Sequence, residues 1–200
     1  MAKKLIPTAD QSKIQVEQAR YDRGKKSIEG WISSWLKAES VTNAKRDRLI
    51  DLYEMIMLDL NLKSAARNRF SKVLGEAFLM IGKDNLPNKE LVKFFQRKWF
   101  TKTTKMGLEA KLFGFSLIEI YDISPETKEI TETKLIQRRN VLPEAKQVLL
   151  KLGDNEGIPF DNPEISDFFI LVDGEEGLGL LLAIAPSVLM KRFADRKSVV

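Results

Sequence analysis

Apolar residues recur at helical spacing along the first third of the chain. In residues 27–36 the apolar side chains fall on one stripe of a helix: Ile28, Trp31, Ile32, Trp35 and Leu36. The same spacing returns over residues 49–60. A further helix is expected over residues 60–74, with Asp59 as its N-cap and Gly75 after its end. The N-terminal part is therefore predicted to be helical and amphipathic.

The second half of the chain changes to short β-like runs. Residues 76–82 have the length and residue types of a strand, and residues 86–113 return to helical character until Gly114. Four β-like runs separated by turn-rich pieces follow, and the first two resemble a hairpin: 115–123, 129–137, 147–152 and 167–173. A last helix is expected over residues 177–200, with Pro186 as a kink or restart.

The order of these elements predicts an α+β fold. N-terminal amphipathic helices would pack on a small mixed or antiparallel sheet, with a C-terminal helix closing the chain. We expect an N-terminal arm over residues 1–43, which includes the short amphipathic helix, and an α+β domain over residues 44–200. The 200 residues, 44% of them hydrophobic, are enough for one domain with a core.

The short helix of the arm carries an apolar cluster that must be covered. Trp31 and Trp35, together with Ile28, either dock onto their own domain or anchor the arm in a neighbouring subunit, since aromatic anchors concentrate at interfaces. The spacing leaves both interpretations open.

Composition excludes much chemistry. The chain has no cysteine and no histidine, so it lacks disulfides, thiolate nucleophiles, the commonest general base and the commonest metal ligand. Gly174, Gly177 and Gly179 match no phosphate-binding loop, because no lysine follows them into the helix. We expect no cofactor and no metal, and an enzyme is the least expected class.

No segment is predicted to enter a membrane. The N-terminus lacks the continuous apolar stretch of a secretory signal, and the longest apolar run, 178–186, is far below the roughly 20 residues that cross a bilayer. A cytoplasmic protein without a membrane partner is expected.

Charge is divided unevenly along the chain. Residues 1–113 hold 23 Lys/Arg against 13 Asp/Glu, a net +10, whereas residues 114–200 hold 10 against 15, a net −5. One basic and one acidic side would suit nucleic acid binding, subunits that stack head to tail, or solubility alone.

Residues 93–105 interleave cations with aromatic rings. The cations are Lys93, Arg97, Lys98, Lys102 and Lys105. Single-strand binders combine such charges with aromatic platforms, yet the same spacing on a helix would turn the rings inward and leave an ordinary solvated face. A monomeric nucleic-acid-binding module is therefore the alternative function.

Glu119 lies between two isoleucines in the predicted strand 115–123. A carboxylate on a half-buried face is normally neutralised, so we expect it to pair with Arg67 or Arg69 of the packed helices. No neighbouring base or nucleophile motif supports catalysis by this residue.

Several segments together resemble, in order, the N-terminal half of bacteriophage portal proteins, and those of Mu-like phages in particular. The segments are 49–81, "LEAKLFGFSLIEIYDI", "KLIQRRNVLP" and "FFILVDGEEGLGLLLAIAPSVLMKRFADRKSVV". The positions that match the family pattern are Asp59, Arg69, Gly114, Phe115, Glu119, Arg139, Pro143, Gly177, Gly179, Lys191 and Arg192. The order of these motifs carries the resemblance, which covers residues 46–200.

The resemblance implies a structural role rather than catalysis. It implies a wing-like part of a ring of about twelve copies at one capsid vertex, through which double-stranded DNA passes without being read. Terminase, head-tail connector or tail proteins, and capsid proteins would be partners, with the host cytoplasm as the place of assembly. Glu119, Asp59, Arg67, Arg69 and Gly114 would be architectural. Because portal proteins usually continue much further, we expect the domain to be truncated at its C-terminus.

Overall fold

The computed structural model describes residues 14, 28–40, 44–82, 85–154, 156–174 and 177–197. The helices are α1 (Ile28–Ala38), α2 (Asp47–Ile56), α3 (Leu60–Gly75), α4 (Lys89–Phe95), α5 (Lys98–Leu108), α6 (Ala110–Phe113) and α7 (Leu180–Lys197), with 3-10 turns η1 (Arg138–Asn140) and η2 (Ser166–Phe168). The α+β fold predicted from the sequence is confirmed.

Two antiparallel sheets form the β part. The larger has the order β2-β1-β6, from β1 (Phe115–Ile123), β2 (Ile130–Leu135) and β6 (Phe169–Asp173). The smaller has the order β3-β4-β5, from β3 (Val141–Leu142), β4 (Gln147–Val148) and β5 (Ile158–Pro159). The hairpin predicted for the first two runs is present, with Glu119 opposite Lys134. Strand β1 is therefore the centre of the larger sheet.

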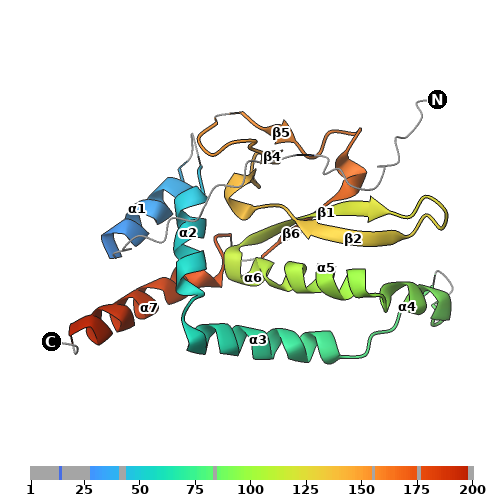
Figure 1. Ribbon diagram of the computed structural model, residues 1–200, viewed down its shortest axis with the longest axis horizontal. Coiled ribbons are helices and arrows are strands. Elements are labelled where there is room, and N and C mark those ends of the chain that lie inside the picture. The colour runs from blue at the N-terminus through green and yellow to red at the C-terminus, as the bar shows by residue number, and fades with distance from the viewer. Residues whose placement is uncertain are drawn as a thin grey trace.

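The elements stack in layers (Figure 1). The smaller sheet and its loops lie above the larger sheet, α5 and α6 lie beneath it, and α3 runs along the lower side of α5. Helices α1, α2 and α7 pack against one another at one end of the layers. Helix α3 is therefore separated from the larger sheet by α5.

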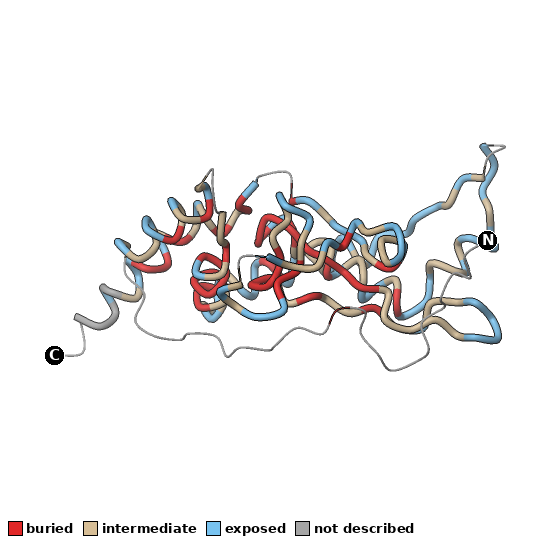
Figure 2. The backbone as a smooth tube through the Cα atoms, turned by 90° about the horizontal axis from the view of Figure 1, so that it is seen from above, coloured by how far each residue is buried: buried red, intermediate tan, exposed pale blue. Residues whose placement is uncertain are grey.

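The core lies on both sides of β1, where the buried residues gather in the middle of the molecule (Figure 2). Phe115 and Leu117 point into the main core with α2 and α7. Ser116 points the other way, and its hydroxyl donates to the carbonyl of Met106 in α5, 2.7 Å away. A strand buried on both faces reads as a nearly continuous apolar run, which explains "FSLIEI".

Local sequence determines where the helices begin. Asp59 accepts hydrogen bonds from the backbone N–H groups of Asn61 and Leu62, as predicted for an N-cap. Asn88 does the same for α4, and this cap was not predicted. The caps determine where α3 and α4 start.

A buried ion pair connects α2 to η1. The Arg139 Nε atom lies 3.0 Å from Asp51 Oδ1, and its Nη2 donates to Oδ2 at 3.3 Å. Both side chains are less than a tenth exposed. A pair held this tightly fixes the position of the chain after β2 against α2.

The strand predicted over residues 76–82 is wrong. The segment is not part of a sheet and makes one isolated bridge, Ile81 with Pro87. Gly82 donates to the carbonyl of Leu86, and Asn88 donates to that of Met80, so the chain turns back on itself before a strand can form. Suitable residue types were present, but a neighbouring strand was not.

The helical character predicted for residues 86–113 is present, divided among α4, α5 and α6. Two other expectations are corrected. Of the predicted run 147–152, β4 covers only Gln147–Val148. Pro186 lies within an uninterrupted α7, so it marks no restart. Within the part of the chain that the structure describes, no helix has both the length and the apolar character of a membrane span.

The buried pair supplies a test of stability. Replacing Asp51 by Asn leaves the Arg139 charge buried without its carboxylate, so Asp51→Asn should lower the free energy of unfolding by about 3–5 kcal/mol. Glu132→Gln, in the half-exposed pair of Lys102 and Glu132, should cost at most about 1 kcal/mol. Urea unfolding measures both. Equal losses would show that burial adds nothing to the Asp51–Arg139 pair.

Candidate functional site

Glycines form a close contact between the turn before α7 and the corner between α6 and β1. Gly114 adopts a φ of 91° and Gly179 a φ of 82°, both in the left-handed region. A Cβ on Gly114 would lie 2.9 Å from the carbonyl carbon of Leu178, and one on Gly179 would lie 2.7 Å from that of Phe113. Only glycine fits at either position. We call this contact the glycine junction.

Gly174 completes the glycine junction from the end of β6. Its N–H donates to the carbonyl of Gly114 at 2.8 Å, and a Cβ at this position would lie 2.8 Å from the same oxygen. Backbone therefore packs directly on backbone, and the β6 end, the α7 start and the β1 start are held together without intervening side chains.

Tyr53 of α2 and Arg46, the residue before α2, hold the turn from the other side. The Tyr53 hydroxyl donates to the carbonyl of Leu178 at 2.7 Å. Burial raises the pKa of Tyr53 well above its usual range, although the positive charge of Arg46 acts to lower it. Arg46 donates to the carbonyl of Gly177 at 3.1 Å and lies over the Phe115 ring. The orphan carbonyls of a buried turn are thereby satisfied.

The far end of α7 is fastened to the α2–α3 connection. The Lys191 ammonium lies 2.8 Å from Asp59 Oδ2, and Arg192 donates to the carbonyl of Met55 at 3.0 Å. The hydrogen bond from Lys191, followed by that from the Leu62 N–H, holds the pKa of the Asp59 carboxyl below its usual value. Asp59 thus caps α3 with one oxygen and binds α7 with the other.

Arg138 supports the same corner from the opposite face of the sheet. Its guanidinium donates to the Phe115 carbonyl and to Ser116 Oγ, pairs with Glu109 at 3.0 Å, and stacks over the Phe113 ring. The next residue, Arg139, binds Asp51 of α2. Two successive arginines thus anchor the chain on both sides of β1. The sequence pattern "RRN" alone did not indicate this division.

A hollow of about 180 Å³ opens beside the glycine junction, between Arg46, Phe115, Glu144 and Asp173 among others. The Arg46 guanidinium inside it is already paired with Glu144. No group of His, Cys, Asp or Glu in the described residues is arranged to hold a metal ion. The Arg46 guanidinium is therefore engaged in holding this region together, through Glu144 and the Gly177 carbonyl.

The basic-aromatic segment 93–105 forms a folded face. Its rings contact one another: Phe94, Phe95, Trp99 and Phe100. Arg97 pairs with Glu129 and lowers the pKa of that carboxyl, while Lys102 pairs with Glu132. Lys93, Lys98 and Lys105 are exposed. The rings are thus engaged with each other, which favours the solvated helix face over a stacking platform for bases.

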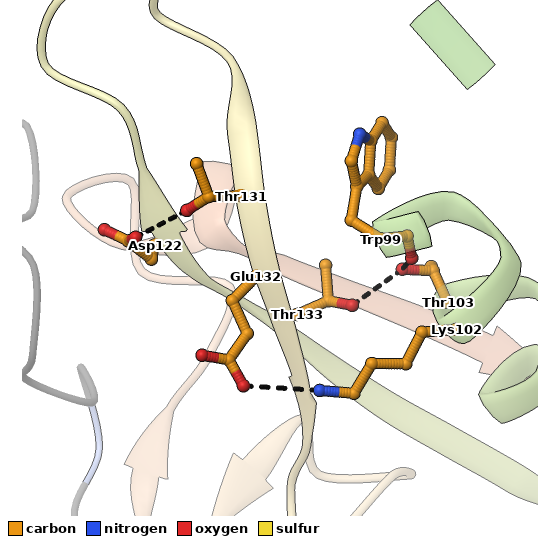
Figure 3. A network of polar contacts seen from close by, with 7 residues as sticks. All are labelled: Trp99, Lys102, Thr103, Asp122, Thr131, Glu132 and Thr133. Atoms are coloured by element: carbon orange, nitrogen blue, oxygen red, sulfur yellow. Dashed lines mark hydrogen bonds and ion pairs between the residues drawn. The ribbon is translucent and has the colours of Figure 1, made fainter. Parts of the chain in front are cut away.

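Polar contacts attach this segment to the hairpin (Figure 3). Thr103 Oγ1 lies 2.8 Å from Thr133 Oγ1 and donates to the Trp99 carbonyl, and Lys102 reaches Glu132 on the same strand. On the far side of the hairpin, Thr131 donates to Asp122. Glu132 of β2 consequently neutralises part of the basic face of α5.

The expected partners of Glu119 are corrected. Glu119 is 1% exposed in the larger sheet, whereas Arg67 and Arg69 are exposed on α3, beyond α5. Within the described residues neither arginine forms an ion pair. Glu119 faces Lys134 across the strands, and the Lys134 ammonium lies over the Tyr121 ring, so the cation on this face comes from the hairpin. Helix periodicity could not show which layer α3 occupies.

Helix α1 packs on its own domain. Trp31, Trp35 and Ile28 lie against the main core, and the two tryptophan rings are 5.6 Å apart. Ile32 and Leu36 of the same stripe remain exposed. Contact with a neighbouring subunit through α1 stays a prediction. The predicted boundary between the arm and the α+β domain, after residue 43, also stays a prediction, because residues 41–43 lie outside the described part of the chain.

Comparison with known proteins identifies a family. The sequence matches the family model of the portal protein of Mu bacteriophage over residues 50–197, a range that runs from α2 through the glycine junction to the end of α7. No curated protein and no solved structure matches the chain.

Alanine at the glycine junction should be costly. Gly114→Ala combines a left-handed backbone with a clash against backbone atoms, so it should lower the free energy of unfolding by about 3 kcal/mol. Gly153→Ala separates the two causes, because Gly153 has a φ of 103° and open space around it; it should cost only about 1–2 kcal/mol. Urea unfolding of both variants decides whether close packing at Gly114 matters.

The Asp59 carboxylate should make the stability depend on pH. Its pKa is lowered in the folded state, so its stabilisation is present above the usual value of 3.8 and is lost as the pH falls through the folded-state pKa. Asp59→Asn keeps a helix cap but loses the pair with Lys191. Its unfolding midpoint in urea should lie below that of the wild type at neutral pH, and the difference should vanish in acid. A difference independent of pH would refute the role of the charge.

Proposed function

Since the chain belongs to the family of Mu bacteriophage portal proteins, we propose that it is a structural subunit of a ring of about twelve copies at one vertex of the phage capsid. The ring would form the channel for packaging and ejecting double-stranded DNA. Terminase, head-tail connector or tail proteins, and capsid proteins would dock onto it. A phage portal is a component of the virion, and its family is structural rather than enzymatic.

The observation that carries this proposal is the unbroken family match from α2 to α7. It spans the glycine junction and the contacts that hold α7, which are features of architecture rather than of chemistry. A structural role also agrees with a chain that has no histidine and no cysteine.

The distribution of charge supports assembly in a closed ring. Residues 1–113 carry a net +10 and residues 114–200 a net −5. In a head-to-tail contact each copy would place its basic surface against the acidic surface of the next, and such a contact closes into a ring when the rotation allows. The excess of positive charge would also favour the proximity of DNA without reading its sequence.

Mass photometry and negative-stain electron microscopy of the purified chain test the proposal. Rings of about a dozen copies should appear at low and moderate salt. The alternative, a monomeric module that binds nucleic acid through residues 93–105, predicts monomers whose affinity for single-stranded DNA falls steeply with salt. Monomers that bind DNA in this manner would contradict the portal assignment of function and support the module.

A further inference from the structure

Strand β6 is an exposed and apolar edge of the larger sheet. Among the described residues it pairs with β1 alone, so its outer row of backbone N–H and C=O groups is left to solvent. Ile170 and Leu171, on opposite faces of the strand, are 38% and 39% exposed. An apolar edge of this kind is a template for a further strand.

The opposite edge of the sheet is protected. Strand β2 carries Thr131, Glu132 and Lys134, and Glu132 is held by Lys102. Charged residues on an edge discourage pairing with other chains, whereas "FILV" in β6 has no charge and no proline. The two edges therefore differ, and only that of β6 favours addition of a strand.

A segment suited to that edge exists elsewhere in the chain. Residues 77–81, "AFLMI", follow α3, and Leu79 and Ile81 are 74% and 63% exposed. Met80 and Gly82 bond inward to residues 86–88, and within the described part of the chain the backbone groups of 77–79 and 81 have no hydrogen-bond partner. One edge of this segment is therefore occupied and the other is free.

The surroundings of the two edges differ in charge. Around the 77–81 segment, exposed Lys72 and Lys89 are matched by exposed Glu76 and Glu90, whereas near β6 the exposed Glu164 and Asp173 are both acidic. Among the described residues neither lysine makes an ion pair, nor does Glu164 or Asp173. Bringing the two edges together would let the unpaired lysines approach these carboxylates.

We propose that residues 77–81 of one subunit add as a strand to the free edge of β6 in the next copy, extending β2-β1-β6 across the subunit boundary. The segment lies at the α4 end, beneath α5, and β6 lies in the sheet above α5, so the contact joins different surfaces of two copies (Figure 1). Repetition of such a heterologous contact gives a ring when the rotation between copies closes. This inference rests on the proposed ring assembly and specifies its interface.

Cysteine cross-linking tests the contact, because the natural chain has no cysteine. The full chain with Leu79→Cys and Leu171→Cys, treated with a short bismaleimide, should give a ladder of covalent multimers on a denaturing gel. A mixture of the two single variants should give covalent dimers that contain one copy of each. The matched control, Leu79→Cys with Met190→Cys, uses a more exposed position on α7 and should give no ladder.

A blocking variant tests the same contact without chemistry. Leu171→Lys places a charge on the β6 edge and should weaken association about tenfold or more by mass photometry. Because the side chain is 39% exposed, the melting temperature should fall by no more than about 2–4 °C, which leaves the fold intact. Leu58→Lys, at an exposed position between α2 and α3, should leave association unchanged.

The outcomes separate this contact from the ring itself. Rings without the 79–171 ladder, or rings unaffected by Leu171→Lys, would overturn the contact and leave the proposed function standing. A ladder without closed rings would support the contact and contradict the ring. Monomers without any ladder would overturn both.

Discussion

The contact of backbone with backbone at Gly114, Gly174 and Gly179 is the constraint on which the rest of the fold depends. It brings the end of β6 and the start of α7 against the corner where α6 becomes β1. With any side chain at these positions, α7 would have to move away, and Tyr53 would lose the Leu178 carbonyl on which its buried hydroxyl depends. Residues more than sixty positions apart in sequence are thereby held in fixed positions at one point.

The arginines around the glycine junction convert this local contact into a rigid assembly of layers. Arg138 binds the corner from the α5 side, Arg139 binds α2, and Arg46 binds the turn before α7. Each guanidinium has several fixed donors, so one side chain can satisfy backbone carbonyls and carboxylates from different elements. Such cohesion suits a structural protein of the portal family.

Sequence periodicity predicted the elements better than their placement. The helices of the first half, the Asp59 cap, the β1–β2 hairpin and the α+β class follow from local patterns, and all are present. The order of layers depends on long-range contacts that periodicity does not encode, which is why Arg67 and Arg69 were placed near Glu119. The same limit explains the error at residues 76–82, because strand-forming residues need a partner strand. Gly114 was recognised as a break and as a family position, but its contact with Gly179 appears only in three dimensions.

Residues 76–82, which form no strand, and the uncovered edge of β6 both leave backbone groups without a partner strand. Natural sheets cover, charge or twist their edges, and in this chain the edge of β2 is charged while that of β6 is apolar. The segment 77–81 has strand-forming residues, only an isolated bridge to Pro87 among the described residues, and one free backbone edge, so it could supply the strand that the β6 edge lacks. In the proposed ring both needs can be met by the next copy, and the uneven division of charge along the chain would favour head-to-tail contact. Features that would be liabilities in a monomer are thus consistent with a subunit whose fold is completed by its neighbours.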